Sequence, residues 1–364
     1  MEAQINAFIA TVPDGSTIQF QPGGCYGQDN TIYITNRSNL VIDGNGATFK
    51  ALSLAAMGVN SNWAVEAGSN ITLEDMTIQG DNPYAGILQG SPGCYNASLE
   101  WQYGIAFDAT QGGTVNDVNI NDVYGDFVEA EDYERNTASA PARNILVENS
   151  NFNGNGRMGI GITDAQGVTI QNNHFNGVCW EMVDVELDSN IEYGQNISII
   201  NNTLGTNNFG LLSNQGAGYG GAGEQNCATE YGGDCFHVGN FTVTGNTMTA
   251  VPATTQSPVT IGWPGIYRSN YTITNNYLIS GGGSGMDLEG VSNSTITNNT
   301  VAYGSDQGCG PLGCPVGVFL VDCHNDLIEY NIFPYLPPLG ASFPGGIDRI
   351  DSLSTGVTQV GNSL

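Results

Sequence analysis

The chain has 364 residues and a formal net charge of −28, with one lysine and six arginines as its cationic side chains. A chain this acidic repels phosphate backbones, which argues against nucleic acid as a partner. Hydrophobic residues make up 40% of the chain and charged residues 12%, a balance that excludes a disordered protein and favours a continuous core.

The N-terminal residues 1–34 are expected to form a cap and the first coil of a repeated structure. Residues 5–10 suit a short amphipathic cap, and residues 1–4 have neither a basic region nor a long apolar run. We therefore expect that a signal peptide has been removed and that the protein is secreted or on the cell surface. No stretch of the chain is long and apolar enough to predict a transmembrane segment.

One short pattern then recurs along the chain. An apolar, often β-branched run is followed by polar residues, frequently Asn-Asn, and by one more apolar residue. The clearest copies span residues 168–175, 197–204, 241–248, 271–278 and 294–301, and weaker copies span residues 40–49, 71–78, 114–120, 145–152 and 327–333. Alternation within each run is typical of a short β-strand.

Each copy contains one apolar residue that serves as an anchor for alignment. Successive anchors are separated by 23 to 44 residues, which indicates a coil of fixed length with loops of different size. The anchors predict about ten stacked coils, and they are Ile42, Leu73, Val115, Val147, Ile170, Ile199, Val243, Ile273, Ile296 and Ile328.

The recurring asparagines have a structural explanation. They fall at the same position in successive copies, so their side chains can form an amide ladder along the stack, and asparagine tolerates the bent backbone of a coil corner. The residues concerned are Asn173, Asn202, Asn246, Asn276, Asn299 and Asn331.

This pattern resembles the pectin-lyase-like superfamily of right-handed parallel β-helices over residues 35–335. The resemblance implies an all-β fold with a single solenoid, a short N-terminal cap and an irregular Pro-rich C-terminal tail at residues 336–364. The superfamily includes hydrolases, lyases, epimerases, tailspikes and adhesins, so the resemblance implies a polysaccharide ligand without selecting an activity.

A column of acidic residues follows the repeat in the central coils. Alternation places Asp108, Glu129, Glu131, Asp184 and Glu186 on the outer face of one wall. Stacked strands lie about 4.8 Å apart, so Asp108 and Glu131 are expected to be neighbours, and Glu129 and Asp184 about 10 Å apart. Gly161 is expected to leave open floor between the latter two.

Paired carboxylates at such spacings are what glycoside hydrolysis needs, one as acid and one as base or nucleophile. Outward positions of a half-exposed sheet are polar by default, so part of this column has a purely structural explanation. The hydrolase hypothesis assigns catalysis to Glu129, Asp184 and Glu186. It assigns substrate binding to Asp108, Asp126, Glu131, Arg157, Trp180 and Glu181.

Two other functions remain open. In a polysaccharide lyase, Glu129, Asp184 and Glu186 would hold Ca²⁺ as oxygen ligands and Arg157 would act as the base, whereas the hydrolase needs no cofactor. The third hypothesis is a non-enzymatic adhesin, filament or surface protein that self-associates. The characteristic motifs of polygalacturonases are absent.

The eight cysteines indicate disulfide bonds formed in an oxidising compartment. Cys227 and Cys235 bracket one loop, and Cys309 and Cys314 bracket another. The remaining cysteines are expected to form two further disulfides, and they are Cys25, Cys94, Cys179 and Cys323.

Overall fold

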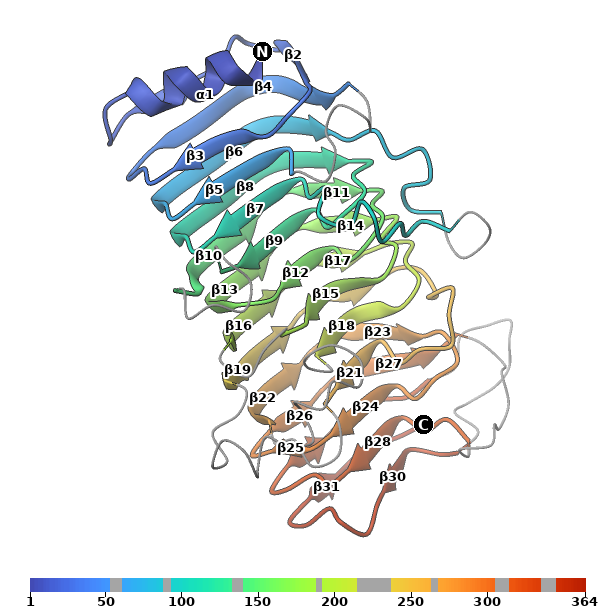
Figure 1. Ribbon diagram of the computed structural model, residues 1–364. Coiled ribbons are helices and arrows are strands. Elements are labelled where there is room, and N and C mark those ends of the chain that lie inside the picture. Colours follow the sequence, from blue (N-terminus) through green and yellow to red (C-terminus); the bar gives the residue numbers. More distant parts are fainter. Residues whose placement is uncertain are drawn as a thin grey trace. The chain divides into compact units, whose positions relative to one another are not determined.

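The computed structural model describes residues 1–52, 61–87, 93–132, 140–187, 192–214, 237–262, 268–304, 314–334 and 345–364. The chain divides into two compact units, unit 1 (residues 1–180) and unit 2 (residues 181–364), and each is described by itself. Both units consist of parallel strands stacked coil upon coil (Figure 1).

Unit 1 begins with helix α1 (Glu2–Thr11) and continues as two sets of strands. Its sheet 1 contains β3 (Ile32–Thr35), β5 (Trp63–Glu66), β7 (Ile105–Asp108), β9 (Val128–Glu131) and β12 (Ile160–Ile162). Its sheet 2 contains β1 (Thr17–Gln19), β2 (Cys25–Gln28), β4 (Val41–Ala51), β6 (Ser69–Gln79), β8 (Gln111–Asn121), β10 (Ala142–Glu148), β11 (Asn151–Asn153), β13 (Ala165–Gln171) and β14 (His174–Asn176).

Unit 2 repeats this arrangement. Its sheet 1 contains β15 (Glu181–Val185), β18 (Gly210–Asn214), β21 (Val259–Ile261), β24 (Met286–Glu289), β28 (Val318–Val321) and β30 (Asp348–Ile350). Its sheet 2 contains β16 (Tyr193–Ile200), β17 (Thr203–Leu204), β19 (His237–Thr244), β20 (Thr247–Met248), β22 (Arg268–Thr274), β23 (Tyr277–Ser280), β25 (Val291–Ser292), β26 (Thr295–Thr297), β27 (Thr300–Tyr303), β29 (Leu327–Glu329) and β31 (Thr358–Val360).

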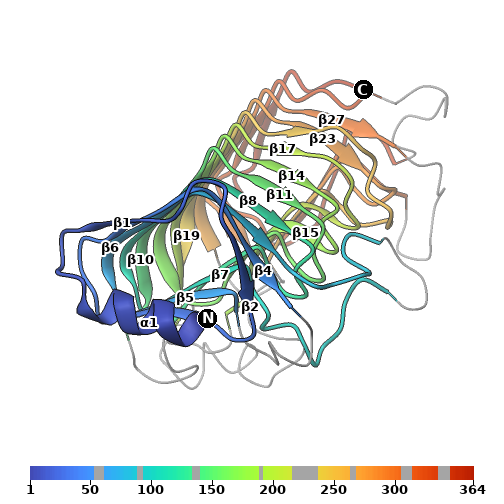
Figure 2. The ribbon, with the colours of Figure 1, turned by 90° about the horizontal axis from the view of Figure 1, so that it is seen from above.

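The core of each unit is a set of apolar columns that run through the stacked coils. In unit 1, Ile42 pairs with Leu73, Leu73 with Val115, and Val115 with Val147. In unit 2, Ile199, Val243 and Ile273 continue in the same way. All ten predicted anchors are at most 1% exposed, which confirms the alignment made from the sequence. Figure 2 shows how the strands of unit 1 line up behind one another.

The Asn-Asn pairs form a corner of the coils in which they occur, and the two residues of a pair have different roles. The first residue takes the left-handed backbone conformation, as Asn275 does with φ 57° and Asn298 with φ 57°. The second is buried and bonds along the stack. The Nδ2 group of Asn276 donates to Asn299 Oδ1 at 2.9 Å and to the Val243 carbonyl at 2.9 Å. The predicted amide ladder is therefore confirmed in unit 2.

Helix α1 covers the free edge of sheet 1 in unit 1 (Figure 1). Asn6 bonds to the backbone of β3 much as a neighbouring strand would. Its Nδ2 group donates to the Thr31 carbonyl at 3.1 Å, and its Oδ1 atom accepts from the Tyr33 amide at 2.9 Å. An uncovered strand edge is a template for association, so the helix protects this end. The predicted N-terminal cap is confirmed as a helix.

The C-terminal residues differ from the irregular tail that the sequence predicts. Strand β30 pairs in parallel with β28, and β31 pairs with β29. Asn362 Oδ1 accepts from the amide of Asn331, so the asparagine ladder also continues into these residues. The repeat was missed because the sequence pattern is weak here, and Ile350 and Val360 are exposed in the structure.

The predicted boundaries at residues 34/35 and 335/336 stay predictions. Within the described part of the chain, no helix is long and apolar enough to cross a membrane.

The ladder gives a testable prediction for stability. Asn276→Ala removes the oxygen that accepts from the Asn246 amide and Nδ2 group, both at 3.0 Å in the buried corner. Leaving buried donors without a partner should lower the free energy of unfolding by about 2 to 4 kcal/mol. Asn275→Gly is the control, because residue 275 is exposed and glycine accepts its left-handed conformation. Urea unfolding of both variants checks this, and equal stability would contradict it.

Candidate functional site

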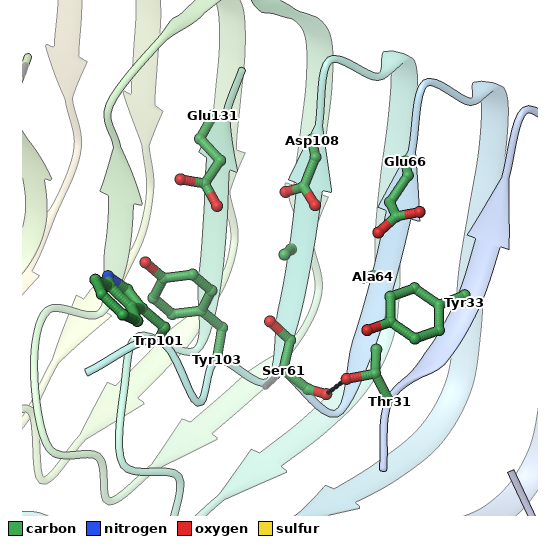
Figure 3. Close-up of a pocket in the computed structure, with 10 residues that line it drawn as sticks. Thr31, Tyr33, Ser61, Ala64, Glu66, Trp101, Tyr103, Asp108 and Glu131 are labelled. Carbon is green, nitrogen blue, oxygen red and sulfur yellow. Dashed lines mark hydrogen bonds between the residues drawn. The ribbon is translucent and has the colours of Figure 1, made fainter. Parts of the chain in front are cut away.

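Sheet 1 of unit 1 carries a groove on its outer face (Figure 3). It encloses about 370 Å³ and runs across strands β3, β5, β7 and β9. A second cavity of about 430 Å³ adjoins it, shares Tyr33 and Glu66, and extends to Asn6 and Ala10 of helix α1. The residues that line the first cavity are Thr31, Tyr33, Ser61, Ala64, Glu66, Trp101, Tyr103, Ala106, Asp108 and Glu131.

Three carboxylates form a row along one side of this groove. Strand register places Glu66 beside Asp108, and Asp108 beside Glu131. Figure 3 shows the three side chains next to one another. Because stacked strands lie about 4.8 Å apart, each coil contributes one acid at that interval. The row confirms that Asp108 and Glu131 are neighbours and adds Glu66, which sequence reasoning missed.

Glu66 could have been found from the sequence. The segment Trp63–Glu66 has the same apolar-small-apolar-acid pattern as Ile105–Asp108, and the two strands pair residue for residue.

Small and aromatic residues form the floor of the groove. Ala64 and Ala106 occupy adjacent positions in the ladder, where larger side chains would fill the space. Tyr103 is buried against them, and Tyr33 packs on the same cluster. Trp101 lines the same groove and is 43% exposed. Flat aromatic surfaces beside carboxylates are a combination suited to sugar rings.

Next to the groove lies a buried polar cluster around Asp126, Glu129 and Arg157. Arg157 donates to Asp126 Oδ2 at 2.8 Å, and the amide of Met158 donates to Asp126 Oδ1 at 2.8 Å. Thr163 Oγ1 donates to Glu129 Oε1 at 3.0 Å. Asp126 and Glu129 are both completely buried. The expected role of Asp126 and Arg157 in substrate binding stays a prediction, and the structure joins them to each other.

The predicted open floor at Gly161 is wrong. A Cβ atom on this residue would collide with the Glu129 carboxylate and would lie 2.6 Å from Asp126 Oδ2. The missing side chain therefore makes room for the carboxyl group of the adjacent coil. The error arose because strand alternation gives the direction of a side chain but not what fills the space beside it.

The surroundings of this cluster raise the pKa of both of its carboxyls. Burial raises the pKa of Glu129 well above 4.5, and the negative charges of Asp126 and Glu131 raise it further. Burial also raises the pKa of Asp126, which the Arg157 guanidinium opposes. The raised pKa favours the neutral form of Glu129, next to an Asp126 that pairs with Arg157.

A disulfide holds the segment 93–104 beside this cluster. Cys94 is bonded to Cys179, and the ring of Tyr95 lies 4.7 Å from that of Trp180. The Tyr95 hydroxyl donates to Glu100, whose carboxylate lies 3.9 Å from Arg157 Nε. The predicted binding residue Trp180 therefore packs within the protein on Tyr95, and its contact with a substrate stays a prediction.

The other cysteines depart in part from expectation. Cys25 and Cys323 are free thiols. Of the two disulfides expected among the four isolated cysteines, one is formed, Cys94–Cys179. The two residues lie on different units, one exposed and one buried. Cys314 is disulfide-bonded. Cys227, Cys235 and Cys309 lie outside the described residues.

The remaining predicted site residues belong to unit 2. Asp184 is buried on β15, and Glu186 follows that strand. Burial raises the pKa of the Glu181 carboxyl to about 7, and the charge of Glu186 adds to the shift. The assignments of Glu129, Asp184 and Glu186 to catalysis, and of Ca²⁺ to the same residues, stay predictions. Because Glu129 is fully buried, any role that it has in catalysis would act through neighbouring residues and not through contact with the substrate.

The raised pKa of Glu129 predicts a pH effect on stability. A carboxyl whose pKa is raised on folding binds more protons when folded, so stability falls as pH rises above about 4.5. Glu129→Gln keeps a neutral side chain of the same size and should reduce this fall. Unfolding midpoints in urea between pH 4 and pH 7 measure it. Glu74→Gln, a substitution on β6 of sheet 2, serves as the control, and equal pH dependence in wild type and Glu129→Gln would contradict the prediction.

Comparison with known proteins gives structural matches only. No protein-family model matches the sequence, and no curated protein matches it. The surface adhesin PfbA of Streptococcus pneumoniae is similar with a TM-score of 0.63 and 16% identity, over 100% of this chain and 86% of that chain.

Two enzymes are similar in the same way. The A-module of the mannuronan C-5 epimerase AlgE6 of Azotobacter vinelandii gives a TM-score of 0.57 and 16% identity, over 99% of this chain and 87% of the other. The endo-xylogalacturonan hydrolase of Aspergillus tubingensis gives a TM-score of 0.53 and 14% identity, over 100% of this chain and 88% of that chain. At these identities the likeness establishes the fold, which is the right-handed parallel β-helix predicted from the repeat.

Proposed function

We propose that the protein is a carbohydrate-active enzyme that holds a glycan chain in the groove of unit 1 and hydrolyses it. The groove offers aromatic side chains on its floor and carboxylates along one side. Sugar rings stack on aromatic faces through their apolar surfaces, and their hydroxyls donate hydrogen bonds to carboxylates. A groove that crosses several coils suits a polymer better than a single small molecule.

One observation carries the proposal: Asp108 and Glu131 face the groove side by side in register. The coil spacing of about 4.8 Å is close to the separation of about 5 to 5.5 Å between carboxyls in retaining glycosidases. In such a reaction one carboxyl protonates the glycosidic oxygen as its bond to the anomeric carbon breaks. The other carboxylate attacks that carbon, and water later hydrolyses the ester that forms.

The buried cluster supports the hydrolase over the lyase. A lyase base must give up its proton to accept one from the substrate. Arg157 pairs with the buried Asp126, and an adjacent carboxylate stabilises the protonated guanidinium. Asp126, Glu129 and Arg157 are better explained as positioning residues next to the groove. Ca²⁺ bound by Glu129, Asp184 and Glu186 remains a proposal, since carboxylate oxygens are the ligands that it prefers.

A binding function without cleavage is the second candidate. One similar structure is a surface adhesin, and the same groove would serve to hold a glycan. The buried Cys94–Cys179 disulfide supports an oxidising location, in keeping with the proposed secretion or surface display.

The proposal is tested on a polysaccharide panel with and without Ca²⁺. New reducing ends should appear, without the ultraviolet absorbance of an unsaturated uronate that a lyase would produce. Asp108→Asn and Glu131→Gln should each lower the rate by about 10²-fold or more, because each removes an acid–base or nucleophilic group. Glu74→Gln on sheet 2 should leave the rate unchanged.

Each outcome separates the candidates. Binding of a glycan without new reducing ends would contradict the hydrolase hypothesis and support the adhesin hypothesis. Absorbance that requires Ca²⁺ and is lost in Arg157→Ala would establish the lyase. Full activity in both Asp108→Asn and Glu131→Gln would move catalysis away from this groove, with Asp184 and Glu186 as the next residues to change.

A further inference from the structure

The second cavity of unit 1 has no part in the cleavage proposed above. It encloses about 430 Å³ and is lined by Asn6, Ala10, Tyr33, Thr35 and Glu66. Tyr33 and Glu66 also line the groove, so the second cavity continues the groove towards helix α1. The proposed catalytic pair, Asp108 and Glu131, lines the groove alone.

Strand register shows that an aromatic ring stands where the two cavities meet. The floor column runs from Ala106 through Ala64 to Tyr33, so a ring follows two small side chains. Tyr33 is half-buried, because it packs on the floor cluster while also lining both cavities. Figure 3 shows this ring on the side of Glu66, whereas Trp101 lies on the side of Glu131. The floor therefore has an aromatic surface near each end.

Polar groups accompany this ring in the second cavity. Thr35 follows Glu66 in the outer column, and Thr35 Oγ1 donates to Glu66 Oε2 at 2.8 Å. A hydroxyl and a carboxylate held together beside a ring suit a sugar, which stacks through its apolar face and hydrogen-bonds through its hydroxyls. The net charge of −28 disfavours an anionic polymer, so a neutral sugar is the better ligand.

The second cavity is too far from the catalytic pair to be filled by the sugar that is cleaved. Strands β5 and β3 follow β7 in this direction, so a coil spacing of about 4.8 Å places β3 about 10 Å from β7. In the opposite direction, strand β12 contributes no residue to the lining of either cavity. A single sugar ring cannot span the distance from β7 to β3, so only a longer chain can occupy both places.

We infer that Tyr33, Thr35 and Ala10 form a distal subsite, which binds a neutral sugar residue of the glycan two coils away from the point of cleavage. Ala10 lies one turn after Asn6 on helix α1, and its small side chain is exposed on the wall of the cavity. Binding at such a distance makes turnover depend on the length of the chain. This inference rests on the proposed glycan hydrolysis and adds selection for long substrates.

The test compares neutral oligosaccharides of three and six units, prepared from β-1,4-glucan, β-1,4-xylan, β-1,3-glucan and α-1,3-glucan. The wild type should cleave the hexamer with the higher kcat/KM, because only the hexamer reaches the distal subsite. Ala10→Leu fills part of that subsite and should raise KM for the hexamer about threefold to tenfold, with kcat unchanged. The kinetics of the trimer should stay as in the wild type.

Two sets of variants separate binding from folding. Gln4→Leu is the matched control, because Gln4 is exposed on the same helix and lines neither cavity. Tyr33→Ala should raise KM for the hexamer as Ala10→Leu does, and Tyr33→Phe should restore most of the loss because it keeps the ring. Urea unfolding shows whether each variant retains the fold.

The inference would be overturned by equal kcat/KM for trimer and hexamer in the wild type, or by equal effects of Ala10→Leu on both. In either case, cleavage that Asp108→Asn abolishes would leave the proposed function standing. If the oligomers are bound without being cleaved, calorimetric titration applies the same comparison to Kd. If none of these neutral oligomers is bound or cleaved, the inference fails, whatever the wider polysaccharide panel shows for the proposed function.

Discussion

Parallel pairing of each strand with the equivalent strand of the next coil is the constraint on which this structure depends. It fixes the register, so whatever residue occurs at one position of the repeat becomes a column through the stack. Buried isoleucines and valines form the core column, and asparagines form the corner ladder. The carboxylate row of Glu66, Asp108 and Glu131 is built by the same rule on the outer face.

The corner shows how a residue type is selected by two demands at once. A sharp bend requires a backbone with positive φ, and the next residue must satisfy buried polar groups on adjacent coils. Asparagine meets both demands, as a left-handed residue at the first position and as a ladder residue at the second. Gly245 shows that the first demand is separable, because it takes the same positive φ, 69°, without a side chain.

The outer wall of unit 1 combines an open groove with a closed cluster. The groove acids lie where a ligand can reach them, whereas Asp126 and Glu129 are fully buried. Burying these carboxyls is unfavourable unless neighbours compensate. Here Arg157 and the Met158 amide bond to Asp126, and Thr163 bonds to Glu129. The Cys94–Cys179 disulfide fixes part of the surrounding chain. Such a rigid support is what a binding wall needs in order to keep its carboxylates in place.

The repeat in the sequence determined the parallel β-helix, its core columns, its asparagine ladder and the outward direction of Asp108 and Glu131. These follow from a period and a facing rule, which are local and repeat from coil to coil. The tertiary structure alone decided that Glu129 fills the space above Gly161, that Arg157 pairs with Asp126, and that Trp101 and Tyr103 reach the groove. Those contacts depend on where non-repeating loops fold back, and the spacing of residues in a sequence carries no information about that.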